Sequence, residues 1–280
     1  MRYLNTLNIT EESTMKTDIV IISKGKGGLI YRALDSIHDH SNPKEIGKIC
    51  LSWNGDKETL KKVERQLKSL GFNYVVEKIP YHFSQNNNLM VKKHCQSDVV
   101  LFLNDDIQLQ DDFISKGLEL LEKPQVGFVG CKLIRPDETI QHAGVIAFVD
   151  GVGNLIGPAH YLYNYKDDKD TEDWTPLAVT GACMMCRRET FLKLGCFNEE
   201  YDEGFQDFDI CVRAVIENKI NVCLNSCSQL HEESATRDRK VLQHDSDLLS
   251  SFWHCSITRL MKSQSASCVG ICERRVGVKQ

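Results

Sequence analysis

Short apolar runs alternate with amphipathic stretches along the first half of the chain. Runs of this length predict buried strands, and apolar residues three and four positions apart between them predict helices. The predicted strands are residues 18–23, 48–53, 73–78, 99–103 and 126–131, and the predicted helices are residues 29–38, 57–70, 87–95 and 112–122. Strands and helices that alternate in this way build βαβ units. The pattern therefore predicts an α/β fold with a mostly parallel central sheet and helices on both faces.

The pattern becomes less regular after Arg135. Residues 136–176 contain turns, a glycine-rich patch and an acidic loop, which is more typical of a solvated surface than of a site. Beyond them the sequence predicts helices at 188–194, 208–218 and about 245–261, and a short strand at 221–224. The expected organisation is a leader at 1–17, one α/β domain at 18–240, and a C-terminal helix and tail at 241–280.

Composition narrows the class of protein. The chain has 280 residues and a formal net charge of −5, whereas surfaces that bind nucleic acid are normally basic, so no nucleic-acid partner is expected. The sequence shows neither the apolar core of a secretory signal nor a run of about 20 apolar residues that could span a membrane. We therefore expect a cytoplasmic protein, and peripheral membrane contact stays open.

The twelve cysteines are scattered along the chain, and several lie in apolar runs. This distribution is typical of small buried thiols in a reducing compartment. The alternative is a structural zinc site formed by Cys183, Cys186, Cys223 and Cys227. No turn residues separate Cys183 from Cys186, so the sequence favours buried thiols.

The first candidate ligand site follows the apolar run 99–103. Asn104, Asp105 and Asp106 come directly after this run. In an open α/β sheet, ligands bind beyond the carboxyl ends of the strands. Clustered carboxylate and amide oxygens suit Mg²⁺ or Mn²⁺, and such ions commonly carry substrate phosphates. The alternative is a turn whose aspartates cap the helix that starts near Asp111.

Polar residues also follow the predicted strand 48–53. Asn54 and Asp56 could hydrogen-bond a base or a ribose, as acidic groups at strand ends do in nucleotide-binding folds. The alternative is a turn in which Asp56 caps the next helix. The glycine-rich basic loop 24–28 matches neither common phosphate-binding pattern, which disfavours a direct phosphate role.

Two motifs in the second half complete the candidate chemistry. Asp207 precedes an amphipathic helix, so it is either a helix cap or, at a loop-to-helix junction, a general base. His231 follows a short strand and precedes acidic residues, a serine and an arginine, a pattern that can coordinate a metal and bind phosphate.

These segments together resemble family-2 inverting glycosyltransferases of the GT-A fold, especially the rhamnosyltransferase-like, O-antigen-type branch. The matching segments, in family order, are 83–88 (FSQNNN), 101–106 (LFLNDD), 126–145, 179–201, 205–214 (FQDFDICVRA) and 230–237 (LHEESATR). The resemblance implies a Rossmann-like GT-A domain with a nucleotide-binding half at 18–106 and an acceptor-side half at 107–240. It also implies a nucleotide-sugar donor and a divalent cation.

Carried over position by position, the resemblance implies roles for individual residues. Asp106 matches the main metal ligand of the family's Asp-x-Asp element, and His231 matches the histidine that often completes the metal site. Asp207 matches the catalytic base. The residues expected to contact the nucleotide sugar are Asn54, Asp56, Asn87, Asn88, Asn104 and Asp105.

The chain departs from the common family pattern at several positions. Gln206 stands where an acid usually precedes the base, and this departure concerns the acceptor side. Cys196 and Asp238 each replace a usual glycine, and Ser23-Lys24 replaces a proline-containing end of the first strand. The presumed base and metal ligands are all retained.

The predicted activity is the metal-dependent transfer of a sugar, with inversion, from a nucleotide-sugar donor to a hydroxyl of a glycan or glycoconjugate acceptor. The expected cofactor is Mn²⁺ or Mg²⁺. One alternative is a sugar-phosphate nucleotidyltransferase, which would need the loop 24–28 to grip a triphosphate. Another is a non-catalytic glycan-binding protein of the same fold, whose mark would be the loss of carboxylates such as Asp106 and Asp207.

Overall fold

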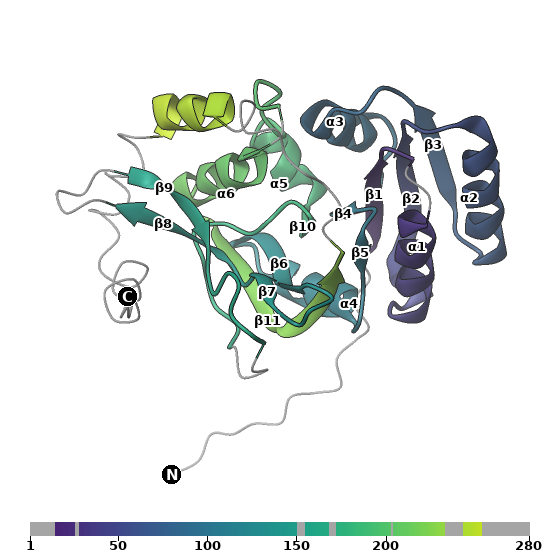
Figure 1. The fold of residues 1–280 in the computed structure, drawn as a ribbon, viewed down its shortest axis with the longest axis horizontal. Coiled ribbons are helices and arrows are strands. Elements are labelled where there is room, and N and C mark those ends of the chain that lie inside the picture. Colours follow the sequence, from purple (N-terminus) through teal and green to yellow (C-terminus); the bar gives the residue numbers. More distant parts are fainter. Residues whose placement is uncertain are drawn as a thin grey trace, which may run out of the picture.

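A computed structural model describes residues 15–25, 28–149, 155–167, 172–202, 204–232 and 243–253. Most of the predicted leader and the end of the predicted C-terminal helix and tail lie outside these residues. Figure 1 shows the arrangement of the helices and strands, which form one mixed α/β unit around a large central sheet.

The first half of the chain builds the parallel part of this sheet. Its elements follow the predicted alternation: β1 (Thr17–Ser23), α1 (Leu29–Asp39), β2 (Ile46–Trp53), α2 (Lys57–Ser69), β3 (Tyr74–Lys78), α3 (Phe83–Lys93) and β4 (Val99–Asn104). A single 3₁₀ turn, Pro43–Glu45, precedes β2. The four strands pair in parallel in the order β3-β2-β1-β4. The carboxyl ends of β1, β2 and β4 therefore meet at one edge of the sheet.

The second half of the chain builds the mixed part. Its elements are β5 (Ile107–Gln108), α4 (Phe113–Leu121), β6 (Val126–Ile134), β7 (Ile140–His142), β8 (Val145–Val149), β9 (Leu155–His160), β10 (Cys183–Arg187), α5 (Arg188–Lys193), α6 (Gln206–Ile216) and β11 (Ile220–His231). Strand β10 lies antiparallel between β4 and β6, and β6 pairs in parallel with β11. β5 and β7 add antiparallel pairs, and β8 with β9 forms a separate hairpin. The sheet is therefore parallel in its first half and mixed in its second.

Two apolar layers cover the two faces of the sheet. Successive residues of β1 point to opposite faces, so Ile19 and Ile21 join the layer under α1, α2 and α4, while Val20 joins the layer under α3, α5 and α6. A further helix, residues 243–253, packs against the second layer through Leu249. The predicted architecture, a central sheet with helices on both faces, is confirmed.

The cysteines follow the same alternation. Cys183 and Cys186 are three residues apart on β10, so their side chains enter opposite layers. They cannot ligate one metal ion together. Nine cysteines fall in the part of the chain that the structure describes, and all nine are buried free thiols.

Several elements differ from the sequence prediction. Helix α3 begins at Phe83 instead of residue 87, because its first two turns bury polar side chains, which hide the apolar spacing. The predicted strand 221–224 extends to His231 as β11, across a register shift after Leu224. The irregular stretch 136–176 contains β7, β8 and β9.

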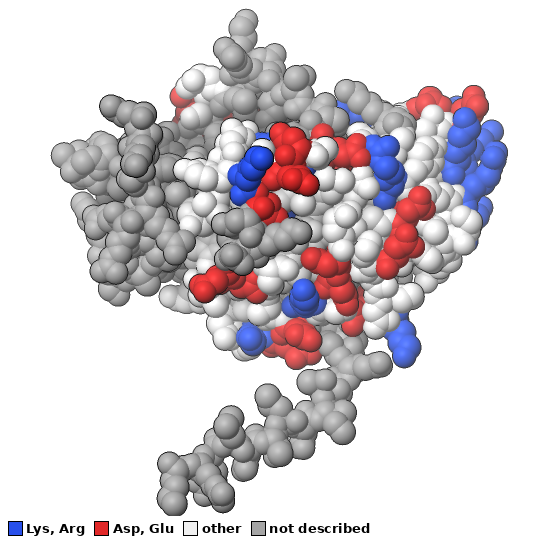
Figure 2. Space-filling model, turned by 60° about the horizontal axis from the view of Figure 1, so that its bottom comes forward, with Lys and Arg blue, Asp and Glu red and all other residues white. Residues whose placement is uncertain are grey.

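The face of the molecule in Figure 2 carries charges of both signs. On the face in Figure 2, the Asp and Glu side chains lie interspersed with Lys and Arg, in small groups. Among the described residues, no helix has the length and apolar character needed to cross a bilayer.

Candidate functional site

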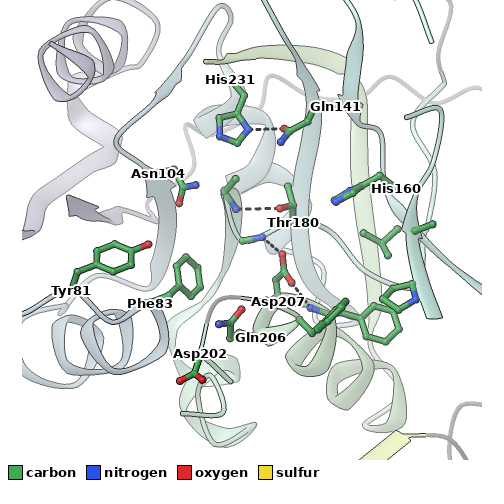
Figure 3. Close-up of a pocket in the computed structure, with 18 of the residues that line it drawn as sticks. Tyr81, Phe83, Asn104, Gln141, His160, Thr180, Asp202, Gln206, Asp207 and His231 are labelled. Atoms are coloured by element: carbon green, nitrogen blue, oxygen red, sulfur yellow. Dashed lines mark hydrogen bonds between the residues drawn. The ribbon is translucent and has the colours of Figure 1, made fainter. Parts of the chain in front are cut away.

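A pocket of about 210 Å³ opens at the edge where the parallel strands end. The elements around it are the end of β4, the β7 strand, the β8–β9 hairpin, the start of α6 and the end of β11 (Figure 3). Its polar lining residues are Lys24, Tyr81, Asn104, Gln141, His160, Thr180, Asp202, Gln206, Asp207 and His231. The fold therefore brings Asn104, Asp207 and His231, which are far apart in sequence, to one cavity.

Asp106 and His231, the two metal ligands expected from the sequence, lie next to each other. His231 Nε2 lies 3.2 Å from Asp106 Oδ1, and both side chains are buried. The other ring nitrogen, Nδ1, lies 2.6 Å from the Gln141 side-chain oxygen, which can only accept a hydrogen bond. Nδ1 therefore carries a proton, and Nε2 is the ring nitrogen that faces the carboxylate.

This arrangement fits a divalent cation. A lone pair and a carboxylate oxygen that face each other are stabilised when a cation lies between them, and histidine ligands usually donate their second N–H to an oxygen, as His231 does to Gln141. Two protein ligands suit an ion that takes its other ligands from water and substrate phosphates. Gln141 was not predicted from the sequence, since nothing in its neighbourhood signals contact with a histidine ninety residues away.

Asp105 lies beside this pair and is tied to the end of β1. The Ser23 hydroxyl donates to its Oδ2 at 2.5 Å. Burial raises the pKa of Asp105 to about 6, the Ser23 hydrogen bond acts in the opposite direction, and the Asp106 charge raises it further. A nearby cation would favour the ionised form of both carboxylates.

Asp207 lies at the start of α6 and lines the pocket. Its Oδ2 accepts a hydrogen bond from the Gly181 N–H and its Oδ1 accepts one from the Phe208 N–H, each at 2.8 Å. A side chain at position 181 would come within 3.3 Å of the Asp207 Cβ, so glycine permits this close approach. The carboxylate is therefore held in place by backbone donors at the N-terminus of α6.

Phe205 turns the chain into this helix. Its φ of 68° lies in the left-handed region, where a bulky residue is strained. The next residues, Gln206 and Asp207, both line the pocket. Figure 3 shows them between Asp202 on one side and Thr180 on the other.

Two other predicted residues, Asn54 and Asp56, lie at the end of β2 and are exposed. The Asp56 side chain accepts a hydrogen bond from the Thr59 N–H at 2.8 Å and caps α2, as the alternative interpretation held. Neither residue is among those that line the described pocket.

Asn87 and Asn88 are buried in α3, and both side chains make hydrogen bonds within the protein. Asn88 donates to the Phe197 carbonyl and accepts from the Phe197 N–H, at 2.9 and 3.0 Å, so its amide completes a two-way bridge to the loop before α6. Asn87 donates to the Phe83 carbonyl within its own helix at 3.1 Å. Their role toward a nucleotide stays a prediction.

A histidine pair, which the sequence reasoning missed, lies beside the pocket. His142 Nε2 accepts hydrogen bonds from the N–H groups of Gly144 and Thr180, both at 3.3 Å, so its proton is on Nδ1. That Nδ1 lies 2.8 Å from His160 Nδ1, which must then be the acceptor. Burial lowers the pKa of His142 well below its ordinary value, so the ring stays neutral. His160 lines the pocket with its own proton on Nε2.

A second group of possible ligands, Asp202, His244 and Asp245, lies outside the Asp106–His231 pair. The two oxygens of Asp245 already accept hydrogen bonds from the N–H groups of Asp202 and Gly204, at 3.0 and 2.8 Å. We therefore assign Asp245 a structural role. It fixes the loop that lines the pocket just before α6.

Comparison with known families decides the class of the domain. Residues 18–195 match the model of glycosyl transferase family 2, which is more than half of the chain. The chain belongs to this family. Its GT-A-type fold agrees with the solved structure of GalNAc-T7 with UDP, GalNAc and Mn²⁺, at a TM-score of 0.67 and 15% identity over 86% of this chain and 48% of that one.

Curated bacterial proteins are similar in sequence to this chain. The chain is 28% identical over 236 residues to the O-antigen biosynthesis protein RfbC of Myxococcus xanthus. This match covers 80% of the chain but only 18% of the length of RfbC. It is 24% identical over 213 residues to the rhamnosyltransferase WbbL of Escherichia coli, and this match covers 70% of the chain and 75% of WbbL. The predicted resemblance to O-antigen-type family-2 proteins is confirmed.

Proposed function

We propose that this family-2 protein transfers a sugar from a nucleotide-sugar donor to a hydroxyl of a saccharide or glycoconjugate acceptor. The observation that carries the proposal is the placement of the Asp207 carboxylate in the same pocket as His231, which pairs with Asp106. Metal-assisted sugar transfer from a diphosphate uses a base near the acceptor and cation ligands near the diphosphate, and here both kinds of group lie close together.

Asp106 and His231 would hold the divalent cation, with Gln141 orienting the histidine ring. When bound, the cation neutralises charge on the donor diphosphate as it leaves. The Mn²⁺ in the related GalNAc-T7 structure supports manganese, with magnesium as the other hard ion of suitable chemistry. Asn104, which lines the pocket, would contact the donor, and Asp105 follows it in the chain with its carboxylate held by Ser23.

Asp207 would act as the general base. Its carboxylate is fixed by the Gly181 and Phe208 N–H groups, and it faces the cavity where an acceptor hydroxyl would lie. Removal of that proton lets the oxygen attack the anomeric carbon from the face opposite the leaving diphosphate, which inverts the configuration. General-base assistance of this kind contributes roughly 10²–10⁴-fold to the rate.

The nucleotidyltransferase alternative has less support. Such an enzyme grips a triphosphate with several cations, whereas Lys24 is the one lysine or arginine in the described lining of the pocket. Its ammonium group lies over the ring of Tyr81, 4.3 Å from the centroid. The retained Asp106 and Asp207 also argue against a non-catalytic glycan-binding protein.

Nine buried free thiols in the described chain support a reducing compartment, and hence the cytoplasm, as the place where the protein works. Peripheral contact with a membrane stays compatible with this location.

Donor hydrolysis tests the proposed function. The protein is incubated with a panel of nucleotide sugars and Mn²⁺, and the released nucleoside diphosphate is measured. We expect release from one donor class, its loss in excess EDTA, and its loss in Asp106→Ala together with weaker Mn²⁺-dependent nucleotide binding. Asp39→Ala is the control, because the Asp39 side chain is 66% exposed at the end of α1 and is not among the residues that line the pocket.

Two results would contradict the proposal. Full activity in excess EDTA would exclude the metal-dependent mechanism. Release of pyrophosphate from a nucleoside triphosphate and a sugar phosphate, without donor hydrolysis, would favour the nucleotidyltransferase.

A further inference from the structure

Gln206 is the first residue of α6 and lines the pocket beside Asp207. Its side chain is only 4% exposed. The amide nitrogen Nε2 is buried and has no hydrogen-bond partner among the described residues. A buried donor without a partner is unfavourable, and native proteins rarely keep one unless something else satisfies it.

The direction of the side chain indicates what could satisfy it. In Figure 3 the Gln206 amide lies in the cavity between the carboxylates of Asp202 and Asp207. Other buried polar atoms without a partner, such as Ser84 Oγ and Tyr201 Oη, belong to residues outside the lining of this pocket. The Gln206 donor is therefore placed where a bound ligand would meet it.

We propose that Gln206 is a specificity-determining residue that donates a hydrogen bond to a neutral oxygen of the acceptor sugar, next to the hydroxyl that reacts. The inference rests on the proposed function, since it takes Asp207 as the base for that hydroxyl. An amide NH₂ can only donate, so the ligand must supply an acceptor atom. A hydroxyl oxygen meets this need and can also donate to a neighbouring carboxylate.

The charges around Gln206 exclude an anionic ligand group at this place. Asp202 and Asp207 both line the same part of the pocket, and a carboxylate on the sugar would be repelled by them. The Gln206 site therefore selects neutral hexoses over uronic acids.

Two variants of Gln206 test the proposal. Gln206→Met keeps the length of the side chain and removes the donor. Since no protein partner is lost, we expect an unchanged or higher melting temperature together with weaker acceptor binding, by about three- to tenfold. Gln206→Glu replaces the donor by a third carboxylate. It should weaken binding further and move the acidic limb of the pH–rate profile, where the rate rises as the base Asp207 loses its proton, to higher pH.

Gln66→Met is the matched control. The Gln66 amide lies on α2 and donates to the Tyr31 carbonyl at 2.9 Å and to Asp35 Oδ1 at 2.5 Å. This substitution removes real protein hydrogen bonds away from the pocket, so it should lower the melting temperature and leave acceptor binding unchanged. The two glutamine-to-methionine changes thus have opposite signatures.

The measurement uses methyl glycosides of neutral hexoses and of uronic acids as probes, with binding followed by saturation-transfer NMR in the presence of a nucleoside diphosphate and Mg²⁺, which is diamagnetic. We expect a neutral glycoside to bind the wild-type protein more tightly than its uronic acid counterpart, and to bind Gln206→Met less tightly. Absence of that binding, equal binding by Gln206→Met, or a preference for the uronic acid would overturn the proposal. Donor hydrolysis by the wild-type protein, measured separately, tells this outcome apart from a failure of the proposed function.

Discussion

At the scale of the residue, Asp207 combines a structural and a chemical role. Both carboxylate oxygens accept backbone hydrogen bonds, one from Gly181 and one from Phe208. In Asp207→Asn the amide oxygen can replace only one of them, while basicity is lost. We expect the transfer rate to fall by roughly 10²-fold or more. The melting temperature should fall by only a few degrees, since one hydrogen bond is worth about 1 kcal/mol.

Asp202→Asn is measured beside it, because Asp202 is the other carboxylate that lines this pocket. Asp202 lines the same pocket, but its side chain is 56% exposed and its carboxylate contacts the protein only weakly, with His244 Nδ1 at 3.7 Å. Rate and melting temperature are measured for both variants, by donor turnover and thermal unfolding. Near-wild-type transfer by Asp207→Asn would remove it as the base and make Asp202 the next candidate. Asp209 is unsuitable, since its carboxylate is buried against Arg213 and Trp253.

At the scale of the element, the helix at residues 243–253 supports the wall of the pocket. Its fully buried Asp245 accepts hydrogen bonds from the N–H groups of Asp202 and Gly204. The Trp253 side chain donates a hydrogen bond to Asp209 Oδ1 on α6, at 2.7 Å. Asp245→Asn leaves one of the two N–H groups facing an amide NH₂. An unsatisfied buried donor costs about 1–3 kcal/mol, so the free energy of unfolding should fall by that amount.

Asp247→Asn tests whether this effect belongs to the buried contact. Asp247 lies on the same helix and is exposed, and within the described part of the chain its carboxylate accepts a hydrogen bond from Gln243 alone, at 2.9 Å. Surface changes of this kind alter stability by less than about 0.5 kcal/mol. Urea unfolding of both variants gives the comparison. Equal stabilities would show that the helix does not hold the loop.

At the scale of the whole molecule, the two apolar layers take up all nine described cysteines. Burial raises the pKa of the Cys131, Cys186 and Cys223 thiols, which keeps them in the unreactive protonated form. Even Cys50 and Cys95 form no disulfide: the Cys95 thiol donates a hydrogen bond to the Cys50 sulfur, 3.8 Å away.

We therefore expect the buried thiols to react slowly in the native protein. Thiol counting on anaerobic, denatured protein without reductant should find nearly all of the twelve cysteines. The native protein measured in parallel is the control, since it should give a much lower count in the first minutes. A count of about four or fewer after denaturation would indicate disulfides and an oxidising compartment.

The local pattern of the sequence determined the parallel half of the fold. The alternation of apolar runs and amphipathic stretches from Thr17 to Asn104 predicts β1 to β4 and their helices, because burial on one or both faces leaves a period in the sequence. Polar residues directly after an apolar run, such as Asn104 to Asp106, indicate a ligand site at the end of the strand. Roles for Asp106, Asp207 and His231 came from motif order.

The tertiary structure decided what depends on partners far away in the chain. β10 lies antiparallel between β4 and β6, and β11 continues past its register shift to carry His231 to Asp106, because pairing with neighbouring strands outweighs local pattern. The same holds for side chains. Gln141 beside His231 and the unpartnered amide of Gln206 leave no local signal, since hydrogen bonds and burial between distant segments exist only once the chain has folded.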